Sequence, residues 1–394
     1  MKILIITSYP FPYGMAQTNR LIAMARGLTH AGADVEVVVS KATEWDTVRN
    51  QMARGDYQGV KFTYTTGTTV RPPHPVKRAI LYYRGLAGVF GHIVRSHGTQ
   101  KVDAVFMGVY SNTVTFLVWL LTRLLGIRYI QERSEYPFLS YQDNPAGRLK
   151  LAIYLKFICA RFDGFVVISR ALQDYFRPYL KNNTRTFLLP ILVESERFST
   201  QLVPVKDVIS YCGSMEGTKD GVPLLVEAFA QIAHRFPEIK LRLIGDTGFD
   251  GFLLLKEKIT TLGVGERVEF TGRVERDEMP SLLQQSRVLA LARPFSKQAE
   301  GGFPTKLGEY LASGRPVVVT AVGDIPYYLV HREHALLAEP GDVDDFAGKL
   351  SEALTDKNTS ETIAEKGRKL AGEVFDYRVQ GKSLFDWLID LTQS

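Results

Sequence analysis

The sequence predicts an α/β protein built from two domains. Its 394 residues exceed the usual size of a single hydrophobic core, and 45% of them are apolar. Short apolar segments with strand character alternate with helical patterns from the amino terminus, and the alternation restarts near residue 208. We therefore expect one domain over residues 1–200, a second over 201–375, and a final helix over 376–394.

The N-terminal half opens with a βαβ pattern. Residues 2–7 form an apolar segment typical of a strand, residues 8–16 form a turn, and residues 17–31 predict a helix. Only four aliphatic residues follow Met1-Lys2, which indicates a strand rather than a secretion signal. Further strands are expected at 35–39, 104–107, 128–131 and 164–168, with a helix at 113–125.

The C-terminal half repeats this alternation of strands and helices. Its last helix carries an apolar stripe of Leu384, Phe385, Trp387 and Leu388, which is typical of packing on a domain core. The strands are expected at 208–211, 240–244, 268–272, 288–290, 317–319 and 335–337, and the helices at 222–235, 251–262, 277–285, 305–312 and 376–391.

Charge is divided unevenly between the halves. Residues 1–198 hold 25 Lys and Arg against 13 Asp and Glu, a net charge of +12, and the remainder holds 23 against 29, a net charge of −6. Two basic stretches, 57–102 and 144–162, contain no acidic residue. In the first, apolar residues follow helical spacing, at Ile80, Tyr83, Ala87, Phe90 and Val94.

Two interpretations of the basic stretches stay open. They could dock on an anionic membrane surface, or they could be solvated faces above ordinary core helices. Binding to nucleic acid is not expected, because no recognition module accompanies the charge.

Composition argues against several classes of protein. Cys159 and Cys212 are the only cysteines and lie far apart, so neither a disulfide framework nor a cysteine metal site is expected. The longest apolar run, 116–121, is shorter than the roughly 20 residues that span a bilayer. Asp342, Asp344 and Asp345 resemble turn and cap residues, and we expect no metal ion. We expect a cytoplasmic protein, peripheral on the inner face of the membrane.

Residues 300–319 form the motif around which the C-terminal half is organised. A loop with Gly301, Gly302 and Pro304 leads into the helix 305–312, and a buried strand follows. The unpaired N–H groups of a helix start and its partial positive charge suit a phosphate. The segment from Phe303 through Pro304 and Thr305 to Lys306 would form this site, and its residues other than proline would supply the N–H groups.

Glu309 lies one helical turn beyond this helix start. Its carboxylate could accept hydrogen bonds from a pair of hydroxyls, and a diphosphate with a diol indicates a sugar nucleotide. An ordinary loop, helix and strand of an α/β sheet would have the same spacing.

The motif resembles the donor-binding signature of retaining glycosyltransferases of the GT4 type, whose GT-B fold has two facing Rossmann-like domains with a cleft between them. In that family, two glutamates eight residues apart flank a Gly-Phe-Gly loop and reach the donor sugar and the ribose. Glu309 matches the second glutamate. The first position holds Gly301, with Glu300 one residue earlier, and Pro304 replaces the second loop glycine. The resemblance implies catalytic roles for Glu300 and Glu309.

The loop at 212–221 carries a second resemblance. The family has Gly-Arg at the start of this loop and a lysine five residues after the arginine. Here Gly213 keeps the glycine, Ser214 replaces the arginine, and Lys219 keeps the lysine. The resemblance implies that Lys219 binds the donor diphosphate and stabilises the leaving group. It also implies a base-binding loop at Arg273 and Val274.

The resemblance is weaker in the N-terminal half. Gly14 holds a small-residue position of the loop that would approach the donor diphosphate or the acceptor. Glu132, Arg133 and Glu135 follow a strand and are candidates for the acceptor side, although capping or surface roles would also explain them. Many members carry a histidine here, and this sequence has none. The GT-B fold further implies that the final helix crosses back to the first domain.

Taken together, the resemblance implies transfer of a sugar from a UDP- or GDP-linked donor to a hydroxyl of a glycan or lipid-linked acceptor. It implies retention at the anomeric carbon, no cofactor and no metal ion, and a role in cell-envelope polysaccharide synthesis. A sugar-nucleotide epimerase of the same fold is one alternative, although no histidine lies in a matched position for acid–base chemistry. A non-catalytic GT-B partner protein is the other, because Ser214 and Gly301 depart from the catalytic pattern.

Overall fold

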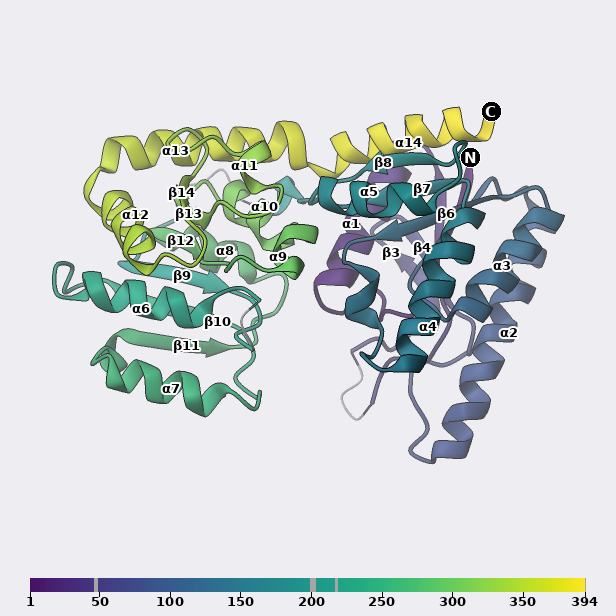
Figure 1. Cartoon of the computed structure of the whole chain (residues 1–394), viewed down its shortest axis with the longest axis horizontal. Coiled ribbons are helices and arrows are strands. Elements are labelled where there is room, and N and C mark those ends of the chain that lie inside the picture. The colour runs from purple at the N-terminus through teal and green to yellow at the C-terminus, as the bar shows by residue number, and fades with distance from the viewer. Residues whose placement is uncertain (46–48, 199–202, 217–218, 394) are drawn as a thin grey trace. The chain divides into compact units, whose positions relative to one another are not determined.

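The structure is a computed structural model that describes residues 1–45, 49–198, 203–216 and 219–393 (Figure 1). The chain divides into two compact units. The N-terminal unit comprises Met1–Leu192 and Tyr377–Ser394, and the C-terminal unit comprises Val193–Asp376. Each unit contains its own sheet, so the α/β prediction with two sheets is confirmed.

The boundary between the units follows Leu192, eight residues before the predicted end of the first domain at residue 200. The N–H of Val193 donates to the carbonyl of Phe375 at 2.8 Å, and Val193 also forms an isolated bridge with Asp376. These bonds attach the chain to the C-terminal unit before the predicted boundary at residue 200. Of the region expected to hold the boundary, 198–204, residues 199–202 lie outside the described residues.

The sheet of the N-terminal unit has the strand order β3-β4-β2-β1-β5-β6-β7-β8. All neighbouring pairs are parallel except β3 with β4 at one edge. The strand order reverses between β1 and β5, which are neighbours. The strands are β1 (Lys2–Thr7), β2 (Asp34–Val39), β3 (Arg54–Tyr57), β4 (Val60–Tyr64), β5 (Ala104–Met107), β6 (Arg128–Arg133), β7 (Gly164–Val167) and β8 (Arg185–Leu188).

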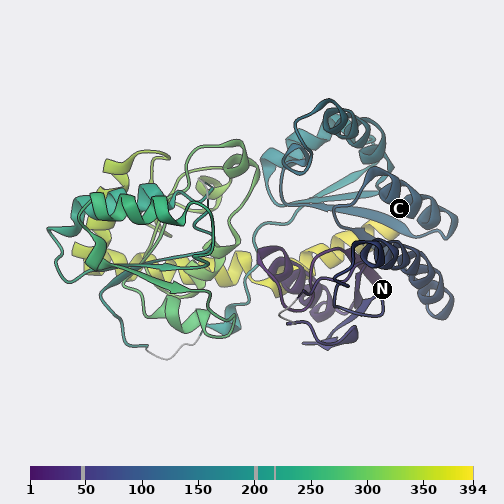
Figure 2. The same ribbon diagram turned by 90° about the horizontal axis from the view of Figure 1, so that it is seen from below.

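Helices cover this sheet, and the last helix of the chain is one of them. The helices are α1 (Ala16–His30), α2 (Pro75–Thr99), α3 (Asn112–Leu124), α4 (Pro145–Ile153), α5 (Arg170–Phe176) and α14 (Tyr377–Gln393). α14 lies beside α1 (Figure 2), where a Cβ on Gly381 would stand 2.3 Å from the carbonyl carbon of Gly27. Leu384 and Leu388 are buried in the core that α1 and β1 share.

The C-terminal unit has a fully parallel sheet of order β11-β10-β9-β12-β13-β14. The strands are β9 (Val208–Cys212), β10 (Lys240–Ile244), β11 (Val268–Gly272), β12 (Val288–Leu291), β13 (Val317–Thr320) and β14 (Leu336–Ala338). The residues of β12 and β13 are all buried, as expected for strands with helices on both faces.

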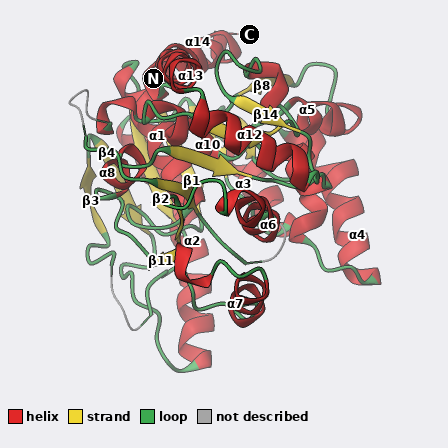
Figure 3. Ribbon diagram, turned by 90° about the vertical axis from the view of Figure 1, so that its left-hand side faces the viewer, coloured by secondary structure: helices red, strands yellow, loops and turns green. Residues whose placement is uncertain are grey.

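The helices of the C-terminal unit follow the strands in alternation, and α6 and α12 lie side by side (Figure 3). They are α6 (Val222–Ala233), α7 (Phe252–Thr261), α8 (Met279–Gln284), α9 (Lys297–Gly301), α10 (Thr305–Ala312), α11 (Ile325–Tyr328), α12 (Val343–Thr355) and α13 (Lys357–Leu370). Short 3-10 helices occur at Pro137–Ser140, Cys159–Arg161, Arg177–Tyr179, Ser195–Arg197 and Gly265–Arg267, and π-helical turns at Tyr154–Ile158 and Ala371–Phe375.

Two local elements differ from the sequence prediction. The hairpin β3–β4 was missed, because β3 is polar and half exposed; its turn places Gln58 and Gly59 at φ of 52° and 83°. Gly301 was predicted in a loop, but it is the last residue of α9. Ser296 begins that helix, because its hydroxyl accepts the N–H of Ala299 at 3.1 Å.

The apolar stripe predicted on α2 faces solvent. Ile80 and Tyr83 are 63% and 68% exposed, whereas the buried face of the helix consists of Gly85, Leu86, Val89, Ile93 and Ser96. The helix prediction was therefore right, and the stripe is not the face that packs on the core.

Candidate functional site

The carboxyl ends of β9 and β12 mark the point where the strand order of the C-terminal unit reverses. The chain proceeds from β9 to β10 and β11 on one side, and β12 to β14 lie on the other side. Open parallel sheets bind their ligands at such switch points, outside the carboxyl ends of the strands. Gly213 follows β9, and Arg293 lies two residues beyond β12.

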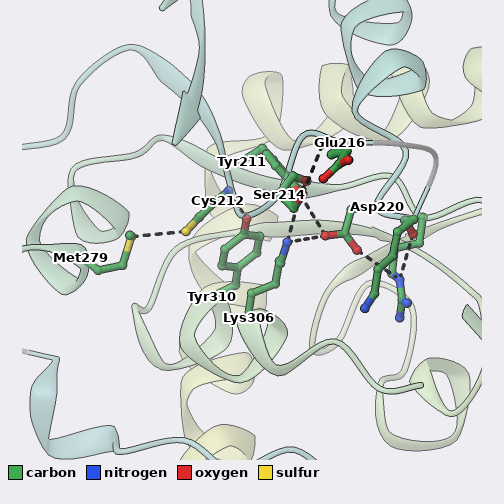
Figure 4. Close-up of polar contacts among 10 residues, drawn as sticks. Tyr211, Cys212, Ser214, Glu216, Asp220, Met279, Lys306 and Tyr310 are labelled. Carbon is green, nitrogen blue, oxygen red and sulfur yellow. Dashed lines mark hydrogen bonds and ion pairs between the residues drawn. The ribbon is translucent and has the colours of Figure 1, made fainter. Parts of the chain in front are cut away.

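Four side chains meet at this point and form what we call the Asp220 cluster: Tyr211, Asp220, Arg293 and Lys306 (Figure 4). The ammonium of Lys306 donates to Asp220 Oδ2 at 2.5 Å and to the hydroxyl of Tyr211 at 3.0 Å. Arg293 Nε lies 3.5 Å from Asp220 Oδ1. The hydroxyl of Tyr211 is 2.9 Å from Asp220 Oδ2 and 2.6 Å from the carbonyl oxygen of Ser214.

The cluster carries one formal positive charge in excess, because two cations share one carboxylate. Asp220 and Arg293 are 8% and 2% exposed. Burial would raise the pKa of Asp220, but Lys306 and Arg293 hold that pKa below its ordinary value. Burial, with Asp220 beside it, raises the pKa of Tyr211 well above the ordinary value, so the phenol stays protonated at neutral pH. A positive charge fixed in a poorly solvated place favours an anion.

Glycine is required where the backbone passes this cluster. Gly213 has φ of +144°, and a Cβ there would stand 1.9 Å from Lys306 Nζ. Gly221 begins α6 with φ of +67°, and its Cβ would stand 1.8 Å from the carbonyl oxygen of Ala292. At its start this loop therefore brings bare backbone against Lys306, and at its end it packs closely on the backbone that follows β12.

The start of α10 supplies Lys306 and free backbone donors. The helix has eight residues, begins at Thr305 and has no side-chain cap on its first turn. Phe303 and Pro304 are buried, and Phe303 stacks on Tyr328 with ring centroids 5.3 Å apart. A Cβ on Gly302 would stand 2.9 Å from the carbonyl oxygen of Gln298. These residues fix the direction of α10, whose first-turn N–H groups point away from the helix.

Glu309 lies one turn into α10 and is 24% exposed. One of its carboxylate oxygens, Oε1, accepts a hydrogen bond from Arg197 Nη1 at 3.0 Å. Arg197 also donates to the carbonyl of Arg276, whose own guanidinium pairs with Glu194 at 2.7 Å. Arg197 lies 112 residues before Glu309, so local spacing in the sequence does not indicate that it shares this carboxylate.

The other predicted donor-side residues have mixed surroundings. Glu300 lies in α9 and accepts from Lys297 Nζ at 2.7 Å. Ser214 is exposed, and its hydroxyl accepts the N–H of Glu216 at 3.2 Å. The side chain of Lys219 is exposed, while its carbonyl oxygen lies 3.4 Å from Arg293 Nε. Of the same loop, residues 217 and 218 lie outside the described residues.

Arg273 and Val274 follow β11 at the same edge of the sheet. Arg273 Nη2 donates to Asp246 Oδ2 at 2.6 Å, and Asp246 follows the neighbouring strand β10. The N–H of Gly248 and then Arg273 lower the pKa of Asp246. Val274 is half-buried.

In the N-terminal unit, Gly14 lies in the loop between β1 and α1. A Cβ on Gly14 would stand 2.1 Å from Thr18 Oγ1, and that hydroxyl donates to the carbonyl of Pro10 at 2.8 Å. Close packing of the loop on α1 accounts for this glycine.

The three predicted acceptor-side residues do not share one environment. Glu132 Oε1 accepts from Arg20 Nε at 2.9 Å and from the hydroxyl of Ser134 at 2.7 Å. Arg133 is buried, and its guanidinium lies over the ring of Tyr154 at 5.2 Å. Glu135 is half-buried.

Tyr9 lies with the two glutamates at the carboxyl end of β6. Burial, followed by the charges of Glu132 and Glu135, raises the pKa of Tyr9. Glu132 and Glu135 therefore lie near Tyr9 at this end of the strand, and the charge of the buried Arg133 also acts on Tyr9, in the opposite direction.

Sequence reasoning missed Tyr211, Asp220, Arg293 and Arg197. Arg293 had a usable signal, because it directly follows the apolar run Val288–Ala292 and so had to lie at a strand's carboxyl end. Asp220 pairs with a lysine 86 residues later, and nothing in local spacing indicates that pairing.

The described residues lack two kinds of feature. They contain no group of three or more His, Cys, Asp and Glu placed to hold a metal ion. Within the same residues, no helix has both the length and the hydropathy needed to cross a bilayer.

The two parallel-sheet units define the class of protein as GT-B. A solved structure of Anabaena HepE in complex with UDP matches with a TM-score of 0.72 and 17% identity, over 99% of this chain and 100% of that one. The model described as "Glycosyl transferase 4-like domain" matches residues 16–191, and that described as "Glycosyl transferases group 1" matches residues 206–356. The chain belongs to the group 1 glycosyltransferase family.

Curated relatives match at modest identity. The chain is 26% identical over 166 residues to mannosylfructose-phosphate synthase of Agrobacterium fabrum, a match that covers 41% of this chain and 36% of that protein. It is 25% identical over 365 residues to the GDP-mannose-dependent alpha-(1-6)-phosphatidylinositol monomannoside mannosyltransferase of Mycolicibacterium smegmatis, covering 88% and 87%. The chain spans 32% to 50% of the length of the first curated relatives that it matches.

Proposed function

We propose that this protein transfers a sugar from a UDP- or GDP-linked donor to a hydroxyl of a glycan or lipid-linked acceptor, with retention at the anomeric carbon, in cell-envelope polysaccharide synthesis. The observation that carries the donor part is the Asp220 cluster, whose excess positive charge lies at the switch point of the sheet. Family membership supports the reaction class. The UDP complex of HepE and the name of the M. smegmatis relative support a nucleotide donor.

In this proposal the diphosphate binds where the bare backbone of Gly213 and the first-turn N–H groups of α10 lie beside Lys306. Lys306 and Arg293 then face the charge that develops on the leaving diphosphate, and Lys219 adds a second ammonium from its exposed position. A preorganised donor of this kind is worth about 3 kcal/mol in the transition state. Glu309 receives the ribose hydroxyls, with Arg197 holding its carboxylate in place.

A thermal-shift panel tests the donor site. UDP, GDP, ADP and their common sugar conjugates are added with and without EDTA. The nucleotide that matches should raise the melting temperature by several degrees, since a ligand at 100 times its dissociation constant adds about 2.7 kcal/mol. The shift should persist in EDTA and disappear in Glu309→Ala and Lys219→Ala. Lys366→Ala is the matched control, because Lys366 lies in α13, is 50% exposed and pairs with Glu333.

Two results would contradict the proposal. Equal shifts in wild type and Glu309→Ala would remove the ribose role, and no shift for any nucleotide would favour a non-catalytic protein. Incubation of the protein with the donor alone separates the remaining alternative, because a new sugar nucleotide would identify an epimerase. Nuclear magnetic resonance of a transferase product gives the anomeric configuration and so tests retention.

We further propose that the N-terminal unit docks on an anionic membrane surface, where a lipid-linked acceptor would be met. Two segments of this unit expose apolar side chains. On α2 these are Ile80 and Tyr83. On α4 and the π-helical turn after it they are Leu149 and Phe157, which are 63% and 58% exposed. Both segments lie in the two stretches that lack acidic residues. Apolar insertion together with basic residues is the combination that binds lipid surfaces, at about 1 kcal/mol per basic residue.

Vesicle flotation tests this docking. Vesicles with phosphatidylglycerol should carry the wild-type protein, and Ile80→Ser/Tyr83→Ser should reduce recovery at least fivefold. Leu253→Ser/Leu254→Ser is the matched control, because these α7 side chains are 71% and 69% exposed in the acidic half. Equal recovery on neutral phosphatidylcholine would refute the electrostatic part.

A further inference from the structure

A concave site lies at the amino ends of the strands in the N-terminal sheet. A cavity of about 510 Å³ opens where β6, β7 and β8 begin, and a smaller one of about 180 Å³ adjoins it, with Arg123, Arg128 and Asp163 lining both. We call the two together the edge groove. A volume of this order suits a small molecule.

The edge groove gathers six basic side chains: Lys101, Arg123, Arg128, Arg161, Lys181 and Arg185. Two carboxylates accompany them, Asp103 and Asp163, so the formal net charge of the lining is 6 − 2 = +4. Five of the six come from α3, from the segment before β7 and from the turns that begin β6 and β8. Because the turns and helix ends bring them together, this is a built feature of the fold and not a run of charge in the sequence.

The two carboxylates are already used by the backbone. Asp103 Oδ2 accepts the N–H of Lys2 at 2.8 Å, and Asp163 Oδ2 accepts the N–H of Tyr129 at 2.8 Å. These bonds fix the starts of β1 and β6, and the two carboxylates are too few to neutralise the six basic side chains. None of the six basic side chains forms a salt bridge with the residues that the structure describes.

Arg161 shows how the groove is built. Its guanidinium lies over the rings of Phe116 and Trp119, with its central carbon 5.4 Å and 5.1 Å from the centroids, and it donates to the carbonyl of Phe157. Its Nε is buried and has no hydrogen-bond partner among the described residues. A buried donor left unsatisfied costs about 1–3 kcal/mol, and a shift of this side chain towards an anion in the groove would relieve that cost.

The groove is separate from the candidate acceptor residues of the same unit. Within its own unit, β6 begins at Arg128 in the groove and ends at Arg133, beside Glu132 and Glu135. Five residue steps at about 3.3 Å put these ends roughly 16 Å apart. The site therefore has its own ligand and does not extend the acceptor side.

We propose that the edge groove binds a ligand with a phosphate group of two or more negative charges. Phosphate suits several guanidinium groups at once, because each can donate two hydrogen bonds to it. The amides of Asn182 and Asn183 line the same cavity and add neutral donors. A soluble phosphate compound and a lipid headgroup share this chemistry, and the exposed Leu124 near the end of α3 makes a lipid source physically reasonable.

The test uses inorganic pyrophosphate as the soluble probe and vesicles with phosphatidic acid as the lipid probe. Binding of pyrophosphate is measured by calorimetry on the full chain, in wild type and in Arg123→Gln/Arg185→Gln. Both arginines are exposed, so the variant should fold, and its dissociation constant should rise at least tenfold. Arg177→Gln is the matched control, since Arg177 is 73% exposed on the same unit and pairs with Asp174.

Two further variants distinguish ligand binding in the groove from the proposed donor site and the proposed docking surface. Lys306→Met should keep groove-dependent pyrophosphate binding, which distinguishes the groove from the donor site. Ile80→Ser/Tyr83→Ser should likewise keep it, which distinguishes the groove from the docking surface. If the protein bound phosphatidic acid vesicles but not pyrophosphate, and Arg123→Gln/Arg185→Gln lost that binding, the result would support a lipid source. Equal affinity of wild type and Arg123→Gln/Arg185→Gln for both probes, or no binding of either, would overturn the proposal.

Discussion

In the N-terminal unit, neutral groups hold the loop after β1, whereas charged groups hold the loop after β9 in the C-terminal unit. The hydroxyl of Tyr64 accepts the N–H of Phe11 and donates to its carbonyl, both at 2.9 Å. Asn50 does the same for Tyr13, at 2.9 Å and 2.8 Å. The loop after β9 instead passes the Asp220 cluster, with its ammonium, guanidinium and carboxylate.

The difference indicates how one construction can serve two purposes. Both loops follow the central strand of a parallel sheet and lead into a helix, so both present backbone at a place where ligands bind. Neutral clamps fix the shape of a loop without favouring a charged ligand. An ionic cluster in which two cations share one carboxylate fixes the loop and also favours an anion. We therefore expect the C-terminal loop to bind the diphosphate.

The largest expected effects come from the Asp220 cluster. Lys306→Met and Asp220→Asn should each lower the free energy of unfolding by about 3 kcal/mol, because each breaks a buried ion pair. Their effects on nucleotide binding should differ: the excess charge falls from +1 to 0 in the first and rises to +2 in the second. Denaturant unfolding and the nucleotide thermal shift measure the two quantities.

This pair of variants can break the comparison. If Lys306→Met lost stability but kept the nucleotide shift, the cluster would be a structural clamp like the one in the N-terminal loop. Lys366→Met serves as the control for removing an exposed lysine. The nucleotide shift of Asp220→Asn should survive and become more sensitive to salt, because more uncompensated charge attracts the anion.

The pH dependence of stability should reveal the same ionic clamp. The folded pKa of Asp220 lies below its ordinary value of 3.8, so the unfolded chain binds the proton first as pH falls. The contribution of Asp220 to stability is therefore complete at neutral pH and is lost as pH falls through 3.8 towards the folded pKa. The difference in unfolding free energy between wild type and Asp220→Asn should stay constant from pH 7 to 5 and shrink below 4. A difference that already changed between pH 7 and 5 would contradict this assignment.

A matched pair of tyrosines compares the neutral bonds of the two loops. Tyr310 accepts the N–H of Cys212 at 2.6 Å, one bond, while Tyr64 satisfies both backbone groups of Phe11. Tyr64→Phe should cost about 2 kcal/mol and Tyr310→Phe about 1 kcal/mol, because the first leaves two buried groups without partners. Tyr13→Phe is the control, since its side chain is 48% exposed. Equal losses of unfolding free energy in the two variants would show that the number of hydrogen bonds does not decide how strongly each loop is held.

Much of the fold followed from local signals in the sequence. The bounds of α10 were predicted correctly, because Pro304 precedes the helix and Gly314 follows it at φ of +69°. Most strands lay within two residues of their predicted positions, since runs such as Val317–Thr320 are continuously apolar. The hairpin β3–β4 escaped because its outer strand has no apolar alternation.

The site was less accessible to sequence reasoning. Gly213, Ser214 and Lys306 were predicted to lie near one anion site, and the structure brings Gly213 and Lys306 into contact around Asp220. Arg293 and Asp220 were not predicted, because burial decides their roles and one sequence does not show which loop residues are buried. The orientation of α2 was also undetermined, since its buried face uses Gly85 and Ser96 in addition to Leu86 and Val89. A helix that packs through small residues does not reveal its inner face by hydrophobicity.

The smallest expected effect concerns Gly14 and sharpens the comparison at the level of packing. Gly14→Ala should cost about 1 kcal/mol, because the new methyl group displaces the Thr18 hydroxyl from the carbonyl of Pro10. A Thr18→Ala background removes the hydroxyl but leaves the Cβ of residue 18 at 2.7 Å and Pro10 Cγ at 2.9 Å from the new methyl group, so adding Gly14→Ala should cost less there but should still destabilise. Gly213→Ala should behave differently, because its φ of +144° strains any side chain even when Lys306 is shortened to Met. Double-mutant cycles on unfolding free energy measure both couplings. If Gly14 and Thr18 showed no coupling while Gly213 and Lys306 did, steric fit would matter only in the charged loop, and the neutral loop would be held by Tyr64 and Asn50 alone.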